Sequence, residues 1–469
     1  MSELHDLTLL EQAAEVRQRS VSPVELVEHY LERIDRLNDA LGAFVTVTAD
    51  LALDAAKRAE AAIGDEALPP LHGVPTAIKD LNLTAGVPTR FGTTAMPPVD
   101  AGVDDFMVSK LKSAGLISLG KTNTPEFGLP CYTEPDVAPP ARTPWDLDRS
   151  AGGSSGGAAA AVAGGLVPAA QGSDGGGSIR IPSSVCGLFG IKPSRGRVSS
   201  APVSAEISGL ATNGPIARTV RDAAALLDAM AGPAPSDWLW APPPPVSFLT
   251  ACDDPPSGLR IGRYATPVVG QTGPHPDCLA AYEAATELLT DLGHTVVEHT
   301  PTFMGQLVDA FETIWSAEFL SLPLDPAIEP QLRPLTRWIR DRGKNASGSD
   351  VYAALATLRM AARTEIEATQ QYDAILTPTL AQPPAFVGQL REDADPAADF
   401  EAQKQFTPFT APYNMSGQPA VSVPLHWTAA GLPIGIQLVG RPCDELTLVR
   451  LSAQLEAAAP WAHRRPECW

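Results

Sequence analysis

Two glycine-dense segments, each containing a serine, constrain this chain more than any other feature of its sequence. They read GGSSGG at residues 152–157 and GSDGGGSIR at residues 172–180. Glycine loses more conformational freedom on folding than any other residue, so such runs destabilise an ordinary helix or strand. We therefore expect the backbone around Ser154 and Ser178 to approach another group closely.

The second segment predicts an oxyanion hole, because consecutive backbone N–H groups can converge on a negative oxygen. The candidate donors are the N–H groups of Gly175, Gly176, Gly177 and Ser178. Serine is a weak nucleophile at neutral pH, so an attack by Ser178 requires a base. Lys79, which closes an apolar segment that begins at residue 71, is the best candidate.

Further motifs accompany these segments in a fixed order. The sequence GVP at 73–75 precedes Lys79, CGLFGIKPSRGR follows at 186–197 and GPIARTVRD at 214–222, with weaker matches at 413–420 and 431–437. Together these motifs resemble the amidase signature family, over roughly residues 66–232 and 372–442. Several ordered motifs are far more specific than any one of them.

The resemblance implies a catalytic triad in which Ser178 is the nucleophile, Ser154 is a bridging serine in a cis peptide, and Lys79 is the base. We also expect supporting roles for three residues around the two serines, Ser155, Asp174 and Arg180. Asp174 and Arg180 are interpreted as an ion pair that steadies the loop, in preference to substrate contacts.

Such a base must be neutral at working pH, although a free lysine titrates at about 10.4. Burial disfavours an ammonium, and the neighbours Ile78 and Leu81 are consistent with a buried Lys79. Asp80 would oppose this shift unless it points to the other side of the strand, as alternation along a strand predicts.

Each of these residues also has an ordinary structural interpretation. Ser154 could cap a helix over residues 158–163, Ser178 could begin another helix, and Lys79 could be a surface charge at a strand end. Any one of these would be preferred for a residue taken alone. Their joint occurrence favours the catalytic interpretation.

Two other kinds of site compete with the triad. Residues 152–156 match Gly-x-Ser-x-Gly, the nucleophile elbow of α/β-hydrolases, with His426 or His463 as the histidine. An elbow needs a buried strand before the serine, whereas residues 141–149 are charged and interrupted by proline. A phosphate-binding loop is a further alternative, but neither common phosphate-binding motif is present.

Within the family, one alternative is the glutamine amidase subunit of a tRNA-dependent amidotransferase. Residues 198–210 depart from the tyrosine- and serine-rich stretch expected for that branch. The chain more closely resembles stand-alone bacterial amidases, including those that act on cyclic nylon oligomers and on urethanes.

The net charge of −20 on 469 residues argues against nucleic acid and anionic membrane surfaces as partners. The six cysteines form no Cys-x-x-Cys pair and the eight histidines no His-Glu-x-x-His motif, so we expect neither metal nor cofactor. The N-terminus lacks a secretory signal pattern, which predicts a cytoplasmic protein. We expect a monomer or homodimer that acts on a small molecule.

The alternation of predicted strands and helices indicates an α/β fold, with a central mixed β-sheet covered by helices on both faces. We expect one large domain with four sections. These are an N-terminal helical segment (1–65), the signature core (66–240), a variable substrate-selecting section (246–371) and a C-terminal return to the core (372–469).

These observations predict hydrolysis of a carboxamide, with carbamate, anilide or ester as related substrates, through an acyl-enzyme. Apolar residues near the site favour a hydrophobic or aryl substrate. The candidate pocket residues are Phe127, Cys131, Thr133, Ile314 and Trp315.

Overall fold

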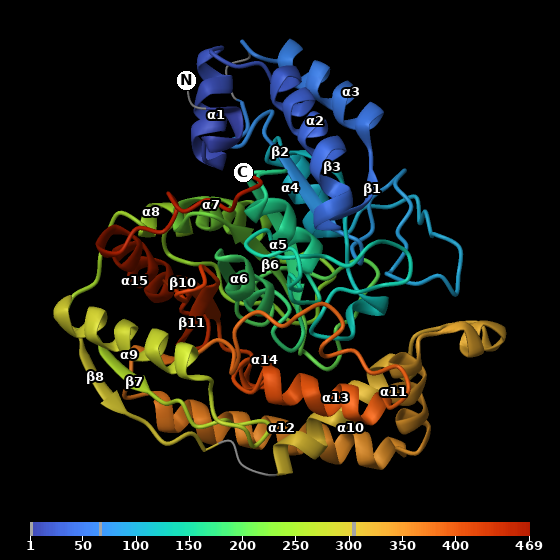
Figure 1. The fold of residues 1–469 in the computed structure, drawn as a ribbon, viewed down its shortest axis with the longest axis vertical. Helices are drawn as coiled ribbons and strands as arrows, with labels where there is room; N and C mark the ends of the chain where they lie inside the picture. Colours follow the sequence, from blue (N-terminus) through green and yellow to red (C-terminus); the bar gives the residue numbers. More distant parts are fainter. Residues whose placement is uncertain (1–2, 65–67, 303–305) are drawn as a thin grey trace.

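The computed structural model describes residues 3–64, 68–302 and 306–469. The expected boundary between the N-terminal segment and the core, at residues 65 and 66, therefore lies outside the described residues. Figure 1 shows the N-terminal helices at one end of the molecule and a layer of long helices at the opposite end.

The N-terminal segment contains three α-helices and one short 3₁₀ helix. The sequence Ser22-Pro23-Val24-Glu25 predicts the start of the longest helix of this segment, α2, and the structure confirms it. Ser22 Oγ accepts a hydrogen bond from the N–H of Glu25, whose carboxylate accepts one from the N–H of Ser22. The elements are η1 (Leu4–Asp6), α1 (Leu9–Gln18), α2 (Pro23–Leu41) and α3 (Ala49–Ala61).

A three-stranded sheet follows, with the order β1-β3-β2. Its strands are β1 (Phe44–Val47), β2 (Pro75–Lys79) and β3 (Ile117–Thr122), and α4 (Phe106–Ser113) connects the last two. β2 runs parallel to β3 and is buried along its whole length. Lys79 is therefore carried on a small separate sheet rather than on the large central one.

The central sheet has eight strands in the order β4-β6-β5-β10-β11-β9-β7-β8. β7 pairs in parallel with both β8 and β9, whereas the other pairs are antiparallel, so the sheet is mixed as expected. The strands are β4 (Ala169–Asp174), β5 (Phe189–Lys192), β6 (Thr212–Ala217), β7 (Arg260–Arg263), β8 (Thr295–Glu298), β9 (Ala374–Pro378), β10 (Ala420–Trp427) and β11 (Pro433–Gly440).

Helices cover both faces of this sheet. Successive residues of a strand point to opposite faces, so a strand can pack against a helix layer on either side. Leu376 of β9 packs in one apolar cluster with helices α7, α9 and α15, whereas its neighbour Ile375 packs in another with Leu358 of α12. The covering helices are α5 (Gly156–Ala163), α6 (Arg180–Cys186), α7 (Val220–Met230), α8 (Phe248–Ala251), α9 (Pro276–Asp291), α12 (Gly348–Thr369), α14 (Pro412–Ser416) and α15 (Glu445–Ala458).

The section at 246–371 is continuous with the core, because its strands β7 and β8 extend the central sheet at one edge. Its remaining helices lie beside α13 in the lower layer of Figure 1. Phe319 of α10 and Ile339 of α11 are buried against each other there. The remaining elements are η2 (Glu126–Gly128), α10 (Gln306–Leu320), η3 (Pro326–Gln331), α11 (Pro334–Lys344) and α13 (Pro396–Phe406).

Candidate active site

The side chain of Lys79 meets three serine hydroxyls in the interior. Its Nζ lies 2.8 Å from Ser154 Oγ, 2.9 Å from Ser155 Oγ and 3.0 Å from Ser173 Oγ. Lys79 is fully buried. Ser173 is a member of this group that the sequence analysis did not identify, although it lies in the second glycine segment.

Burial lowers the pKa of Lys79 to about 7, and the negative charge of Asp174 opposes this shift only in part. A large fraction of the amine is therefore unprotonated near neutral pH. Asp80 does not form an ion pair with Lys79, because its carboxylate instead accepts hydrogen bonds from the N–H of Arg90. This agrees with the expectation that Asp80 points away from the site.

The first glycine segment forms a tight loop before α5. The Gly153–Ser154 peptide bond is cis, as the family resemblance implies. A Cβ on Gly153 would come within 2.7 Å of the backbone nitrogen of Tyr132, so only glycine fits there. Ser154 does not cap the helix, since Ser155 occupies the position before Gly156 and the Ser154 hydroxyl is bonded to Lys79.

The second glycine segment lies against the first, because the N–H of Ser155 donates to the carbonyl oxygen of Ser178 at 3.2 Å. Ser178 is half-buried and, with Gly176, forms part of a pocket wall. The two predicted catalytic serines therefore lie on adjoining loops, and the hydroxyl of one of them, Ser154, is bonded to Lys79.

One of the four predicted oxyanion donors is already occupied. The N–H of Gly177 donates to Asp174 Oδ1 at 2.7 Å, so it orders the loop instead. Among the described residues, no hydrogen bond uses the N–H groups of Gly175, Gly176 or Ser178, and these three remain the candidates.

Asp174 and Arg180 form the ion pair that the sequence analysis expected. Arg180 Nε and Nη2 donate to the two carboxylate oxygens of Asp174, each at 2.9 Å, and both side chains are fully buried. Burial alone would raise the pKa of Asp174, but the charge and hydrogen bonds of Arg180 outweigh it and hold that pKa well below its usual range.

This ion pair is joined by residues from the C-terminal part of the chain. Arg180 donates to Asn414 Oδ1 at 2.6 Å and to Gln437 Oε1 at 2.7 Å, and Asn414 Nδ2 donates back to Asp174 at 2.8 Å. The sequence analysis found the motifs that contain Asn414 and Gln437 but gave neither residue a role.

A cavity of about 80 Å³ lies beside Ser178. Cys131 and Trp315 are part of its wall, as predicted. The Trp315 ring lies 3.4 Å from the position that a Cβ would occupy on Gly175. Other lining residues are Leu129, Ile181, Val308, Phe311, Phe400 and Met415.

The other three candidate pocket residues, Phe127, Thr133 and Ile314, are not among those that line this cavity. Phe127 packs against Phe91, with ring centroids 6.5 Å apart. Thr133 is fully buried, and its hydroxyl accepts a hydrogen bond from the N–H of Gly156 at 3.2 Å. Ile314 is buried in the apolar cluster that also contains Leu358 of α12, and it is not among the residues that line the cavity.

The nucleophile-elbow alternative is wrong. No strand element precedes Ser154 within residues 141–151, where the structure has only isolated bridges such as Arg142 with Ser150. The chain also lacks the α/β-hydrolase arrangement, because Lys79 rather than a histidine is bonded to the Ser154 hydroxyl.

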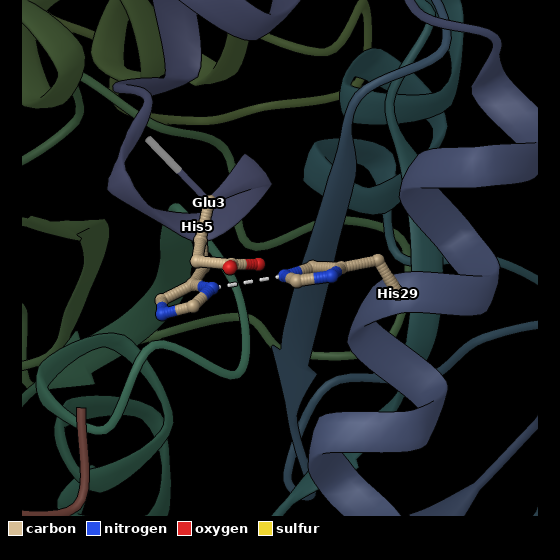
Figure 2. A group of neighbouring side chains, drawn as sticks. All are labelled: Glu3, His5 and His29. Carbon is tan, nitrogen blue, oxygen red and sulfur yellow. Dashed lines mark hydrogen bonds between the residues drawn. The ribbon is translucent and has the colours of Figure 1, made fainter. Parts of the chain in front are cut away.

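Figure 2 shows the one group of three potential metal ligands found among the described residues, Glu3, His5 and His29, whose ligand atoms lie within 4.8 Å of one another. His5 Nδ1 and His29 Nε2 share a hydrogen bond of 3.0 Å. Burial and the nearby Arg33 guanidinium lower the pKa of His5 to about 4. A positive neighbour also disfavours a bound cation, so we interpret the group as a contact that fixes η1 to α2.

Within residues 3–64, 68–302 and 306–469, no helix combines the length and the apolar composition needed to cross a bilayer.

Comparison with known proteins agrees with the geometry. The family model described as "Amidase" matches residues 25–449. An acylamidase of Rhodococcus erythropolis is 36% identical over 477 residues, which cover 99% of this chain and 98% of that protein.

Two solved structures are similar to this chain over almost its whole length. A 6-aminohexanoate cyclic dimer hydrolase superposes with a TM-score of 0.92 at 32% identity, covering 100% of both chains. A bacterial aryl acylamidase of the amidase signature family superposes with a TM-score of 0.88 at 29% identity, covering 98% of each chain.

The chain therefore belongs to the amidase signature family and has its mixed α/β fold. Members of this class hydrolyse amide C–N bonds, and this chain is an amidase of that class.

Proposed function

We propose that this amidase uses Ser178 as its nucleophile, Ser154 as a proton relay and Lys79 as its base. The observation that carries the proposal is the hydrogen bond between the buried Lys79 amine and the Ser154 hydroxyl, next to a pocket that contains Ser178. Because the pKa of Lys79 is about 7, its lone pair is available at neutral pH.

The proposed reaction moves one proton along this row of residues. Lys79 takes the proton of Ser154, Ser154 takes that of Ser178, and Ser178 Oγ attacks the amide carbonyl carbon. The resulting oxyanion faces the N–H groups of Gly175, Gly176 and Ser178. The proton then returns through Ser154 to the leaving amine as the C–N bond breaks.

The acyl-enzyme that remains is ester-linked at Ser178, and water releases the acid by the same relay. Esters should react as well, since an alkoxide leaves more readily than an amine. Carbamates and anilides differ from the proposed substrate only beside the scissile bond, so we include them in the proposal.

A hydrophobic or aryl substrate is supported by the pocket wall, in which Phe311, Trp315 and Phe400 stand beside Ser178. The ring centroids of Phe311 and Trp315 are 5.4 Å apart and the rings are stacked. The similarity to the Rhodococcus erythropolis acylamidase and to the solved aryl acylamidase is consistent with this substrate class.

The test is a panel of aliphatic amides, anilides, carbamates and glutamine, assayed with the parent and with Ser178→Ala. We expect the parent to prefer anilides and long-chain amides and Ser178→Ala to be inactive. Faster turnover of short aliphatic amides would contradict the substrate class, and efficient glutamine hydrolysis would favour the amidotransferase-subunit alternative. Full activity of Ser178→Ala would contradict the mechanism.

A further inference from the structure

The pocket beside Ser178 is formed on its outer side by two helices. Residues on one face of α10, at helical spacing, line it together with one face of α13. The aromatic side chains in this wall are Phe311, Trp315 and Phe400, and the polar ones are Glu312, Gln403, Lys404 and Thr407. An apolar pocket with a few polar groups is the usual form of a small-molecule site, where the polar groups fix the ligand's orientation.

Two of the polar residues already have side-chain hydrogen bonds within the protein. Gln403 accepts a hydrogen bond from the N–H of Cys131 at 2.9 Å and donates to Asp399 at 2.6 Å. The Thr407 hydroxyl donates to the carbonyl oxygen of Gln403 at 2.9 Å. Both therefore hold α13 in place.

Glu312 is similarly committed, because each of its carboxylate oxygens has a cationic partner. One oxygen is 2.9 Å from Lys404 Nζ and the other is 2.6 Å from Arg342 Nη2. Its side chain is only 11% exposed. It therefore acts as a fixed anchor for Lys404 at the pocket wall.

Lys404 retains bonding capacity. An ammonium has three donors, and this one has two carboxylate partners, Glu312 at 2.9 Å and Glu401 at 2.7 Å. Its Nζ also lies over the Phe400 ring, 5.6 Å from the ring centroid. These contacts hold the ammonium in one place with a donor to spare.

The charges around Lys404 indicate which ligand group it would accept. The carboxylates of Glu312 and Glu401 balance the cations of Lys404 and Arg342, so the cluster as a whole is neutral. A ligand carboxylate would give this balanced cluster a net negative charge, whereas a neutral carbonyl oxygen would leave it balanced.

We propose that Lys404 is a specificity-determining residue that donates a hydrogen bond to a second, neutral carbonyl of the substrate. The substrate class is thus an amide in which an apolar spacer separates the scissile carbonyl from another carbonyl group. The spacer lies against the aromatic wall. This inference rests on the proposed function, because it takes Ser178 as the reacting end of the pocket.

The test measures binding in the inactive Ser178→Ala background, so that it does not depend on turnover. The probes are hexananilide, its analogues in which each chain methylene in turn is a ketone, and an analogue with a terminal carboxylate. Dissociation constants from titration calorimetry are compared for Ser178→Ala alone and with Lys404→Met or Lys404→Arg added. The matched control adds Lys57→Met, since Lys57 on α3 has a side chain that is 66% exposed.

We expect one ketone position to bind roughly tenfold more tightly than hexananilide, as a hydrogen bond to a charged donor provides. Lys404→Met should reduce this preference to about threefold or less, while Lys404→Arg and Lys57→Met keep it. Because the result is a ratio within one variant, a general loss of stability does not imitate it.

The inference is overturned if no ketone position is preferred, if no probe binds, if the preference survives Lys404→Met, or if the carboxylate binds most tightly. Hydrolysis of hexananilide by the parent is measured separately. Binding that follows the expected pattern without any hydrolysis would contradict the proposed function and leave the binding inference standing.

Discussion

Lys79 Nζ lies 2.8 Å from Ser154 Oγ, and both side chains are buried. Protonating a buried amine is energetically unfavourable, so this contact places a neutral proton acceptor beside a hydroxyl in the protein interior. The same contact links the three-stranded sheet to the loop before α5, because β2 carries the lysine and that loop carries the serine.

The first prediction concerns the pH dependence of catalysis. The base must be unprotonated, so kcat/KM should rise with pH through an apparent pKa near 7, the pKa of Lys79. Lys79→Met should lower kcat/KM by roughly 10²- to 10⁴-fold and remove this rise. The measurement is kcat/KM for an anilide between about pH 5 and pH 9, which spans roughly two units on either side of that pKa.

The chain offers a matched control in Lys192. Burial, with the nearby positive charge of Arg180, lowers the pKa of Lys192 to about 7 as well, but its Nζ donates to the carbonyl oxygen of Pro193. Lys192→Met should therefore retain the rise in kcat/KM. An unchanged pH profile in Lys79→Met would contradict the role of Lys79.

The second prediction concerns stability. The pKa of Lys79 is about 7 in the folded state, whereas its ordinary value, which applies to the unfolded chain, is 10.5. At a pH between these two values, unfolding therefore takes up a proton. The free energy of unfolding should therefore fall by about 1.4 kcal/mol for each unit of decrease in pH. Below about pH 7 both states carry the proton and the loss is complete.

Denaturant unfolding of the parent and of Lys79→Met tests this prediction. The stability of the variant relative to the parent should increase as the pH falls from 10 to 7, by roughly 4 kcal/mol in total, and then level off. A stability difference that does not change with pH would show that the Lys79 pKa is not depressed by folding.

The third prediction separates two adjacent glycines. A Cβ on Gly177 would come within 2.4 Å of Thr410 Oγ1, and its φ of +136° is one that other residues rarely adopt. A Cβ on Gly176 would meet only Phe311, at 3.9 Å. Gly177→Ala should lower the free energy of unfolding by about 3 kcal/mol or more, whereas Gly176→Ala should change it by less than about 1 kcal/mol. Equal effects in thermal unfolding would contradict this account of the loop.

The fourth prediction concerns the buried ion pair of Asp174 and Arg180. Removing one partner leaves a buried charge unpaired, so Arg180→Met should lower the free energy of unfolding by about 3–5 kcal/mol. The double variant with Asp174→Asn should recover part of this loss, because the carboxylate is then absent. A double variant that loses as much as the sum of both single variants would show that the two residues do not stabilise one another.

Local patterns in the sequence predicted the elements that carry the site. The motifs around Ser154 and Ser178 predicted two close-approaching loops, and the Ser22 capping box predicted α2, because these signals involve neighbouring residues. The mixed sheet with helices on both faces also followed from the alternation of strands and helices.

Contacts between distant segments were not predictable in the same way. Asn414 and Gln437 reach Asp174 and Arg180 across more than 200 residues of chain. The apolar residues of α13 form only a weak stripe along one face, so its periodicity did not indicate that Lys404 and Gln403 would line the pocket. Thr133 was placed in the pocket by its position near the glycine loop, whereas its hydroxyl instead satisfies a backbone N–H.

The central claim is that Lys79 activates Ser178 through Ser154. The most direct measurement is intact-mass and peptide-mapping mass spectrometry after reaction with an electrophilic aryl phosphonate, followed over time. The account predicts one adduct, located on Ser178, that forms readily in the parent and at least about 100-fold more slowly in Lys79→Met and Ser154→Ala. An adduct on another residue, or labelling of Ser178 at the parent rate in both variants, would contradict it.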